Sequence, residues 1–206
     1  MSATTFDEAP FKPFRDYMNG LRDDTGRIPH GRVELMAVHT IVPWIYVLDV
    51  EGGKACEDLT FRFVGTGLCQ GIGFEPTGKS LDQLDFGPSQ EAWRAAYRRI
   101  VATERPHVLS MTHHPNIETM PSYKRGKPNF LLRLAYPTYG DSGVVEKVIG
   151  IGQFLPMTSL PDNEVYEFTL DGETAAQPER RASWSLADAG ERLRGLLNPP
   201  GLEQPA

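Results

Sequence analysis

The sequence predicts an α+β fold in which a five-stranded antiparallel sheet has short helices on one face. The order of patterns along the chain is the first observation: two strand-like runs, several short helical pieces, one longer amphipathic stretch and three more strand-like runs. This order cannot form alternating β-α-β units, which excludes a parallel sheet. The second observation is that the last three strand-like runs are consecutive, and consecutive strands are usually neighbours in a sheet.

The bulk properties fit one folded domain with appended segments. A chain of 206 residues with 40% hydrophobic residues can bury one core. The net charge of -6 includes no basic block, so no nucleic-acid partner is expected. Two cysteines and a polar N-terminus predict a cytoplasmic protein with reduced thiols. No run reaches the roughly 20 apolar residues of a membrane span, so no membrane partner is expected either.

The first half of the chain predicts a helix and a hairpin. An amphipathic helix ending near Gly26 is expected from five apolar residues at helical spacing: Phe11, Phe14, Tyr17, Met18 and Leu21. Residues 31–42 continue as helix or turn until Pro43. Residues 44–51 and 59–66 are rich in β-branched and aromatic side chains, and the link "GGKACED" suits an antiparallel hairpin.

The second half predicts one helix followed by three strands. Apolar residues recur at i and i+4 in 89–104, so this helix should pack its apolar face on the sheet. The periodicity then changes to two, and strands are expected at 107–114, 129–139 and 144–157. From 158 the chain is polar and Pro-rich, except for a final amphipathic helix, "SLADAGERLRGLLN", with Ser185 as its N-cap.

One short stretch, "GTGLCQGIG" at residues 65–73, resembles the phosphate loop of short-chain dehydrogenases. Such a loop needs a sustained helix after it and a long crossover to a parallel strand. Here Pro76 and Gly78 end the helix after about two turns, and no Tyr-x-x-x-Lys occurs in the chain. Dinucleotide binding is therefore not expected.

The element order, together with three stretches, resembles PAS domains. The stretches are "FRFVGTGLCQGIGFEPTGKSLDQL", "AWRAAYRRIVATERPHVL" and "VIGIGQFLPM", and they are similar to a proteobacterial PAS group of unknown ligand. The resemblance covers about residues 27–157, which are expected to form a PAS-like sensor domain. Residues 1–26 are then an N-terminal helical extension, and residues 158–206 are a polar linker with a C-terminal helix.

Cysteine and histidine supply two of the candidate ligand-binding residues. Cys69 lies on the short helix that faces the expected PAS cavity, but the sequence pattern of flavin-adduct domains around it is missing, and a buried free cysteine is usually a small hydrophobe. His113 shares strand parity with two apolar residues and could reach an interior pocket. The adjacent His114 should point to the opposite face, so no metal site is expected. Haem PAS sensors usually take an axial histidine from the longer helix, and 89–104 contains none. His107 lies just beyond this helix, so haem is possible but not expected, and the cofactor stays open.

Aromatic residues supply the other three candidates. Trp93 and Tyr97 lie on the helix face that should meet the sheet, and Tyr136 comes from the strand "NFLLRLAY". Core packing explains them by default, but an inner wall of Tyr, Trp and Arg would suit a small acid or aromatic ligand. A buried Arg133 without a partner would be costly, so it either faces solvent or holds an anion. Because it alternates with the apolar residues of the same strand, the orientation toward solvent or a dimer partner is the one expected.

The expected function is that of a non-enzymatic PAS-type sensory or regulatory protein, with no catalytic residue. It would bind a small molecule or a signalling protein such as a histidine kinase, and it would form a homodimer. Two alternatives stay open. One is an isomerase or hydrolase with Asp49 as general base, although strand alternation directs Asp49 away from the apolar side. The other is a structural dimerisation module that binds no ligand.

Overall fold

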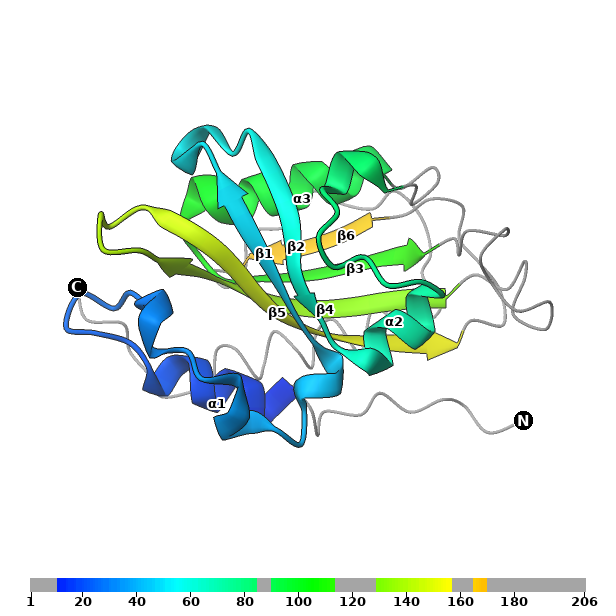
Figure 1. Ribbon diagram of the computed structural model, residues 1–206, viewed down its shortest axis with the longest axis horizontal. Coiled ribbons are helices and arrows are strands. Elements are labelled where there is room, and N and C mark those ends of the chain that lie inside the picture. Colours follow the sequence, from blue (N-terminus) through cyan, green and yellow to red (C-terminus); the bar gives the residue numbers. More distant parts are fainter. Residues whose placement is uncertain (1–10, 85–89, 114–128, 157–164, 170–206) are drawn as a thin grey trace.

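The computed structural model describes residues 11–84, 90–113, 129–156 and 165–169. Its centre is an antiparallel sheet with the strand order β2-β1-β5-β4-β3-β6 (Figure 1). The strands are β1 Ile45–Glu51, β2 Asp58–Val64, β3 His107–His113, β4 Asn129–Tyr139, β5 Val145–Pro156 and β6 Val165–Thr169. The α-helices in this part of the chain are α1 Phe11–Gly20, α2 Thr66–Ile72 and α3 Gln90–Thr103.

The five predicted strands, the β1–β2 hairpin and the long helix are confirmed, each with bounds close to those expected. The element order from β1 to β5 is the one that the PAS resemblance implies. One difference lies after β5. The sixth strand, β6, lies in the segment that we interpreted as a linker and pairs with β3. The expected C-terminal helix at 185–198 lies outside the described residues.

The N-terminal helix is shorter than expected, because it ends at Gly20 and not near Gly26. The Asp23 side chain accepts hydrogen bonds from the backbone N–H groups of Thr25 (2.9 Å) and Arg27 (3.1 Å). Such a local side-chain bond offers the backbone an alternative to the helix and favours a turn. The segment 31–42 forms short 3-10 turns, as its helical or turn-like pattern predicted.

Both faces of the sheet are buried. α2 and α3 cover one face, where they pack on residues such as Leu131 and Ala135 of β4. α1 covers the opposite face, where it packs on Leu132, Leu134 and Tyr136 of the same strand. Figure 1 shows α3 above the sheet and α1 below it. We call these two surfaces the α3 face and the α1 face.

Glycines let backbone and rings approach closely around the α3 face. A Cβ on Gly65, just before α2, would lie 2.3 Å from the Val42 carbonyl oxygen. Gly73 ends α2 with a φ of +95°, a conformation that glycine adopts without strain. The stretch that resembles a phosphate loop is therefore a tight junction from a strand to a helix of only seven residues. No helix among the described residues is both long enough and apolar enough to cross a membrane.

Candidate functional site

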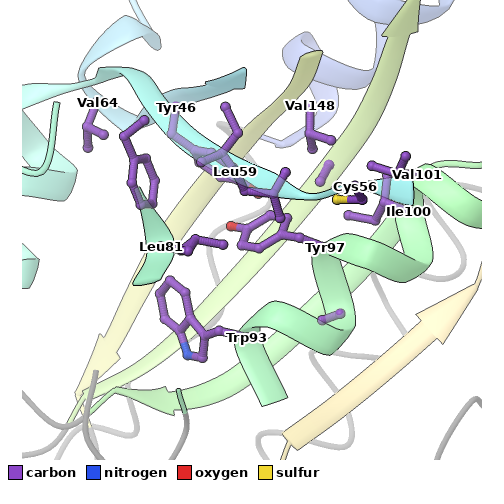
Figure 2. Packing of buried hydrophobic residues seen from close by; sticks show 14 of the residues in the cluster. Tyr46, Cys56, Leu59, Val64, Leu81, Trp93, Tyr97, Ile100, Val101 and Val148 are labelled. Atoms are coloured by element: carbon purple, nitrogen blue, oxygen red, sulfur yellow. The ribbon is translucent and has the colours of Figure 1, made fainter. Parts of the chain in front are cut away.

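The candidate site is centred on Arg133, a charged residue of β4 that is only 1% exposed. Its guanidinium carbon lies 3.9 Å from the centroid of the Trp93 ring and 5.1 Å from that of Tyr97, both on α3. Its Nη1 donates a hydrogen bond to the Tyr97 hydroxyl oxygen. Figure 2 shows Trp93 and Tyr97 projecting together from α3 into the core. The two aromatic side chains therefore hold the guanidinium against the inside of the α3 face.

The other edge of the guanidinium has no partner in the described part of the chain. Nε and Nη2 of Arg133 are buried and make no hydrogen bond there. None of the ion pairs between described residues includes Arg133. A buried charge without an anion or a full set of hydrogen bonds is costly, and a cation–π contact offsets only about 2 kcal/mol of that cost. This edge is thus a buried, positively charged group that the described residues leave without a hydrogen-bond partner.

Arg133 is one of the residues that line a pocket between the sheet, α2 and α3. Its empty volume, including the part that opens to solvent, is about 260 Å³, and it is wide enough for about one water molecule. Apart from Arg133, the described side chains that line this pocket are apolar or aromatic. They are Tyr46, Phe61, Val64, Leu68, Ile72, Trp93, Tyr97 and Leu131.

Two glycines of β5 make room on this face of the sheet. Gly152 pairs with Arg133 across the β4–β5 ladder, and a Cβ there would lie 3.2 Å from the Arg133 Cγ. Gly150 pairs with Tyr46, and its Cβ would lie 2.3 Å from the Tyr46 ring. Glycine inside a strand often marks such a close approach. The alternating glycines of "IGIGQF" are the sequence feature that could have located this site.

The tyrosines around the site are neutral and do not balance the charge of Arg133. Burial raises the pKa of Tyr97, although the neighbouring Arg133 lowers it in part. Burial also raises the pKa of Tyr46 well above the usual tyrosine value of 10, and the adjacent Tyr97 adds to this rise. The Tyr46 and Tyr97 rings meet edge to face, with centroids 6.0 Å apart. Neither hydroxyl therefore supplies a negative charge to offset that of Arg133.

Arg133 does not face solvent or a dimer partner, so that prediction was wrong. Leu132 and Leu134 do lie on the face opposite Arg133, as strand alternation predicts. The face on which Arg133 lies is buried as well, whereas the prediction requires it to be exposed. Since α1 buries one face and α3 the other, every position of β4 from 131 to 139 is buried, and Arg133 points toward α3.

The same geometry separates the aromatic candidates. Trp93 and Tyr97 both line the space at Arg133. Tyr136 lies on the α1 face instead, where its ring meets Phe14 edge to face with centroids 5.9 Å apart. Three residues along a strand reverse the side-chain direction, so Tyr136 cannot share a pocket with Arg133. Its expected place in the same pocket is therefore corrected.

Cys69 lies on α2 but is not among the residues that line the space at Arg133. Its Sγ donates to a carboxylate oxygen of Glu75 at 3.2 Å and approaches the Val64 carbonyl oxygen at 3.5 Å. Burial raises the pKa of the thiol to about 12, and Glu75 adds to this rise. Cys69 is therefore a protonated thiol turned toward Glu75.

The histidines form no metal centre in the described part of the chain. His113 ends β3 opposite Asn129, and its side chain and the whole of His114 lie outside what is described. His107 is fully buried, with Nε2 2.8 Å from the Thr103 hydroxyl at the end of α3. Whether His113 reaches a ligand stays a prediction.

Asp49, the candidate general base, lies outside the apolar pocket. Its carboxylate forms an ion pair with Lys147 at 2.5 Å, and both side chains are partly exposed. A general base in an apolar wall would have to be buried without a cation beside it. The geometry therefore does not favour the isomerase or hydrolase alternative at this residue.

Comparisons with known proteins show only distant likeness. No protein-family model matches the chain, and no curated protein does. A light-oxygen-voltage domain studied with a flavin analogue is 10% identical over 59% of this chain and 83% of its own, with a TM-score of 0.43. VqmA of Vibrio cholera, in complex with ligand and DNA, is 14% identical over 63% of this chain and 54% of its own, at 0.43. A fungal LOV domain photoreceptor is 12% identical over 61% of this chain and 94% of its own, with a TM-score of 0.39.

Proposed function

We propose that this chain is a PAS-type sensory protein that binds a small molecule between its sheet and α3. One observation supports this most strongly: Arg133 is buried with its Nε and Nη2 unpaired, and it lines a pocket. A purely structural core gains nothing from an unpaired buried guanidinium, because a hydrophobic side chain of similar volume is usually at least as stable there. A ligand that accepts hydrogen bonds from this edge would remove the cost.

The helix that contacts the site also connects it to the rest of the domain. α3 holds Trp93 and Tyr97, and directly after its last turn Glu104 forms ion pairs with Arg27 (3.0 Å) and Lys54 (2.9 Å). The Tyr139 hydroxyl donates a hydrogen bond to the Glu104 carbonyl oxygen at 3.1 Å. A ligand that shifts α3 would therefore act on the segment after α1 and on the β1–β2 connection. This coupling is a route by which binding could reach a signalling partner or a second copy of the chain.

A second candidate function is a structural pairing module that binds no ligand. The narrowness of the pocket favours it, because side chains leave room for about one water molecule there. On that account the interior is already complete, and Arg133 is merely tolerated. The two candidates therefore differ in whether anything binds at Arg133.

Native mass spectrometry and a thermal-shift screen distinguish them. The full chain, purified without added ligand, is weighed under native and denaturing conditions, and its melting temperature is measured against a broad set of small acids, amides and nucleotides. A sensor gives either a released small molecule or a saturable rise in melting temperature, which Arg133→Met abolishes. A protein that shows neither, with every class of compound, is not a small-molecule sensor.

A further inference from the structure

We infer that the ligand is a small monocarboxylate whose two oxygens accept hydrogen bonds side-on from Nε and Nη2 of Arg133. This inference rests on the proposed function and names the ligand class for the same site.

The guanidinium is left with one edge that fits a carboxylate. Arginine has five N–H donors in a rigid, planar fork. Nη1 is engaged by Tyr97, and Trp93 covers one face of the plane. Nε and Nη2 lie along the same edge of the planar group. One N–H bond of each runs parallel to the other, at the spacing of two carboxylate oxygens. These are the two nitrogens of Arg133 that lack a partner.

The charge balance favours a single negative charge. Among the described residues that line the pocket, Arg133 is the only charged one. The two lining tyrosines are protonated, because burial holds their pKa values above the usual range. A monoanion therefore neutralises the pocket. A phosphate or a dicarboxylate would place a second charge in an apolar lining without a partner, which is costly.

The lining limits the remainder of the ligand. The described lining includes Phe61, Leu68, Ile72 and Leu131, which offer no hydrogen-bonding side chain. An apolar tail fits such a surface, and a hydroxylated one does not. The side chains leave room for about one water molecule, so they must move apart to admit even a tail of one or two carbons, and an aromatic ring would require a larger movement. Acetate and propionate are thus the probes of choice.

The test compares acids with their neutral isosteres on the full chain. Melting temperature and isothermal titration calorimetry are recorded with acetate and propionate, with acetamide and propionamide, and with sodium chloride at equal ionic strength. We expect the acids alone to bind saturably, and a rise in melting temperature of about 5 to 10 °C at about 100 times Kd. The same titrations with formate and benzoate set the lower and upper size limits.

Three variants assign the binding to the fork. Arg133→Lys keeps a positive charge but loses the planar edge, so the acid-dependent shift should largely disappear. Arg133→Met should lose it completely while remaining folded, since it removes an unpaired buried charge. Arg62→Met is the matched control: Arg62 is an exposed arginine of β2 and should bind acids like the wild type.

The outcomes separate this inference from the function on which it rests. Amides or other neutral compounds that bind at Arg133 while acids do not would overturn the carboxylate and leave the sensor intact. Acids that bind equally well to Arg133→Lys and to Arg62→Met would also overturn it, because the fork would then be unnecessary. Failure of every class of compound would remove the sensor itself. The wild-type comparison of acids with amides decides the question even where Arg133→Met does not fold.

Discussion

The guanidinium carbon of Arg133 lies 3.9 Å from the centroid of the Trp93 ring, in a part of the core where both side chains are 2% exposed or less. This stacking gives the buried charge one favourable interaction, and the hydrogen bond to Tyr97 gives it a second. Neither supplies a negative charge. These two contacts explain how the ligand-free domain tolerates a buried Arg133. They leave its Nε–Nη2 edge without a partner among the described residues.

A double-mutant cycle should detect this stacking. Trp93→Phe, Arg133→Met and the combined variant are compared by urea unfolding of the ligand-free protein. Because a desolvated cation over an indole ring gains more than one over a benzene ring, the two substitutions should couple by about 0.5 to 2 kcal/mol. Free energies of unfolding that add within about 0.3 kcal/mol would mean that the ring and the cation merely lie side by side.

The glycines of β5 give a prediction about space. Gly150→Ala should destabilise the fold by about 2 kcal/mol or more, since its Cβ would lie 2.3 Å from the buried Tyr46 ring. Gly31→Ala is the control, because a Cβ at that exposed position meets nothing within 4 Å. Chemical denaturation of both variants measures the difference. Equal stabilities would show that the Tyr46 ring has another place to go.

How far the sequence determines this site is clearest in β4. The period-two pattern placed Leu132 and Leu134 together and Arg133 opposite them, and the structure agrees. Whether the second face is also buried depends on where α1 docks, and the helical pattern of α1 shows an apolar stripe without identifying the surface on which it packs. Tyr136 was grouped with the wrong layer for the same reason. Alternation within a strand is local, whereas the layers on each side are set by distant contacts.

The sequence also contains signals for the close approach at β5 and for the strand β6, and neither is among the predictions above. Gly150 and Gly152 alternate with isoleucines on β5, which indicates close approach on one face. The stretch "VYEFT" of β6 consists mainly of β-formers, but it is short and surrounded by polar residues. The unpaired state of the Nε–Nη2 edge could not be predicted from the sequence. It depends on which side chains the fold brings next to Arg133, and the described residues around the pocket include no carboxylate.

The ion pairs of Glu104 predict a pH dependence. Lys54 and Arg27 lower the pKa of Glu104 below the ordinary glutamate value of 4.5. A carboxylate with a lowered folded-state pKa stabilises the protein above the unfolded-state pKa, and this contribution is lost as the pH falls through the folded-state value. Glu104→Gln should therefore reduce the free energy of unfolding at pH 7 by up to about 1 kcal/mol.

That difference should begin to fade as the pH falls below the ordinary glutamate pKa of 4.5, and it should vanish once the pH lies below the lowered folded-state pKa of Glu104. The control is Glu51→Gln, at the exposed end of β1, which should match the wild type throughout. Denaturation curves from pH 3 to pH 8 measure both. A deficit of Glu104→Gln that stays constant across this range would exclude the ion pairs as its cause.

Cys69 should be an unreactive thiol whose rate depends on Glu75. Its pKa is raised to about 12 by burial and by Glu75, so little thiolate is present at pH 8. In Glu75→Gln the negative charge is gone, the pKa falls, and alkylation by iodoacetamide should become several-fold faster. Peptide mass spectrometry follows Cys69 and, as internal control, the buried Cys56. An unchanged Cys69 rate would show that burial alone governs the thiol.

The central claim, that the Nε–Nη2 edge of Arg133 holds a carboxylate, is tested most directly by the ¹⁵N-¹H signal of the Arg133 Nε. The signal is assigned by its loss in Arg133→Lys and followed while propionate is added. A hydrogen bond to a carboxylate should move this proton downfield with saturation, and propionamide should leave it in place. A signal that stays fixed while calorimetry records propionate binding would contradict the claim.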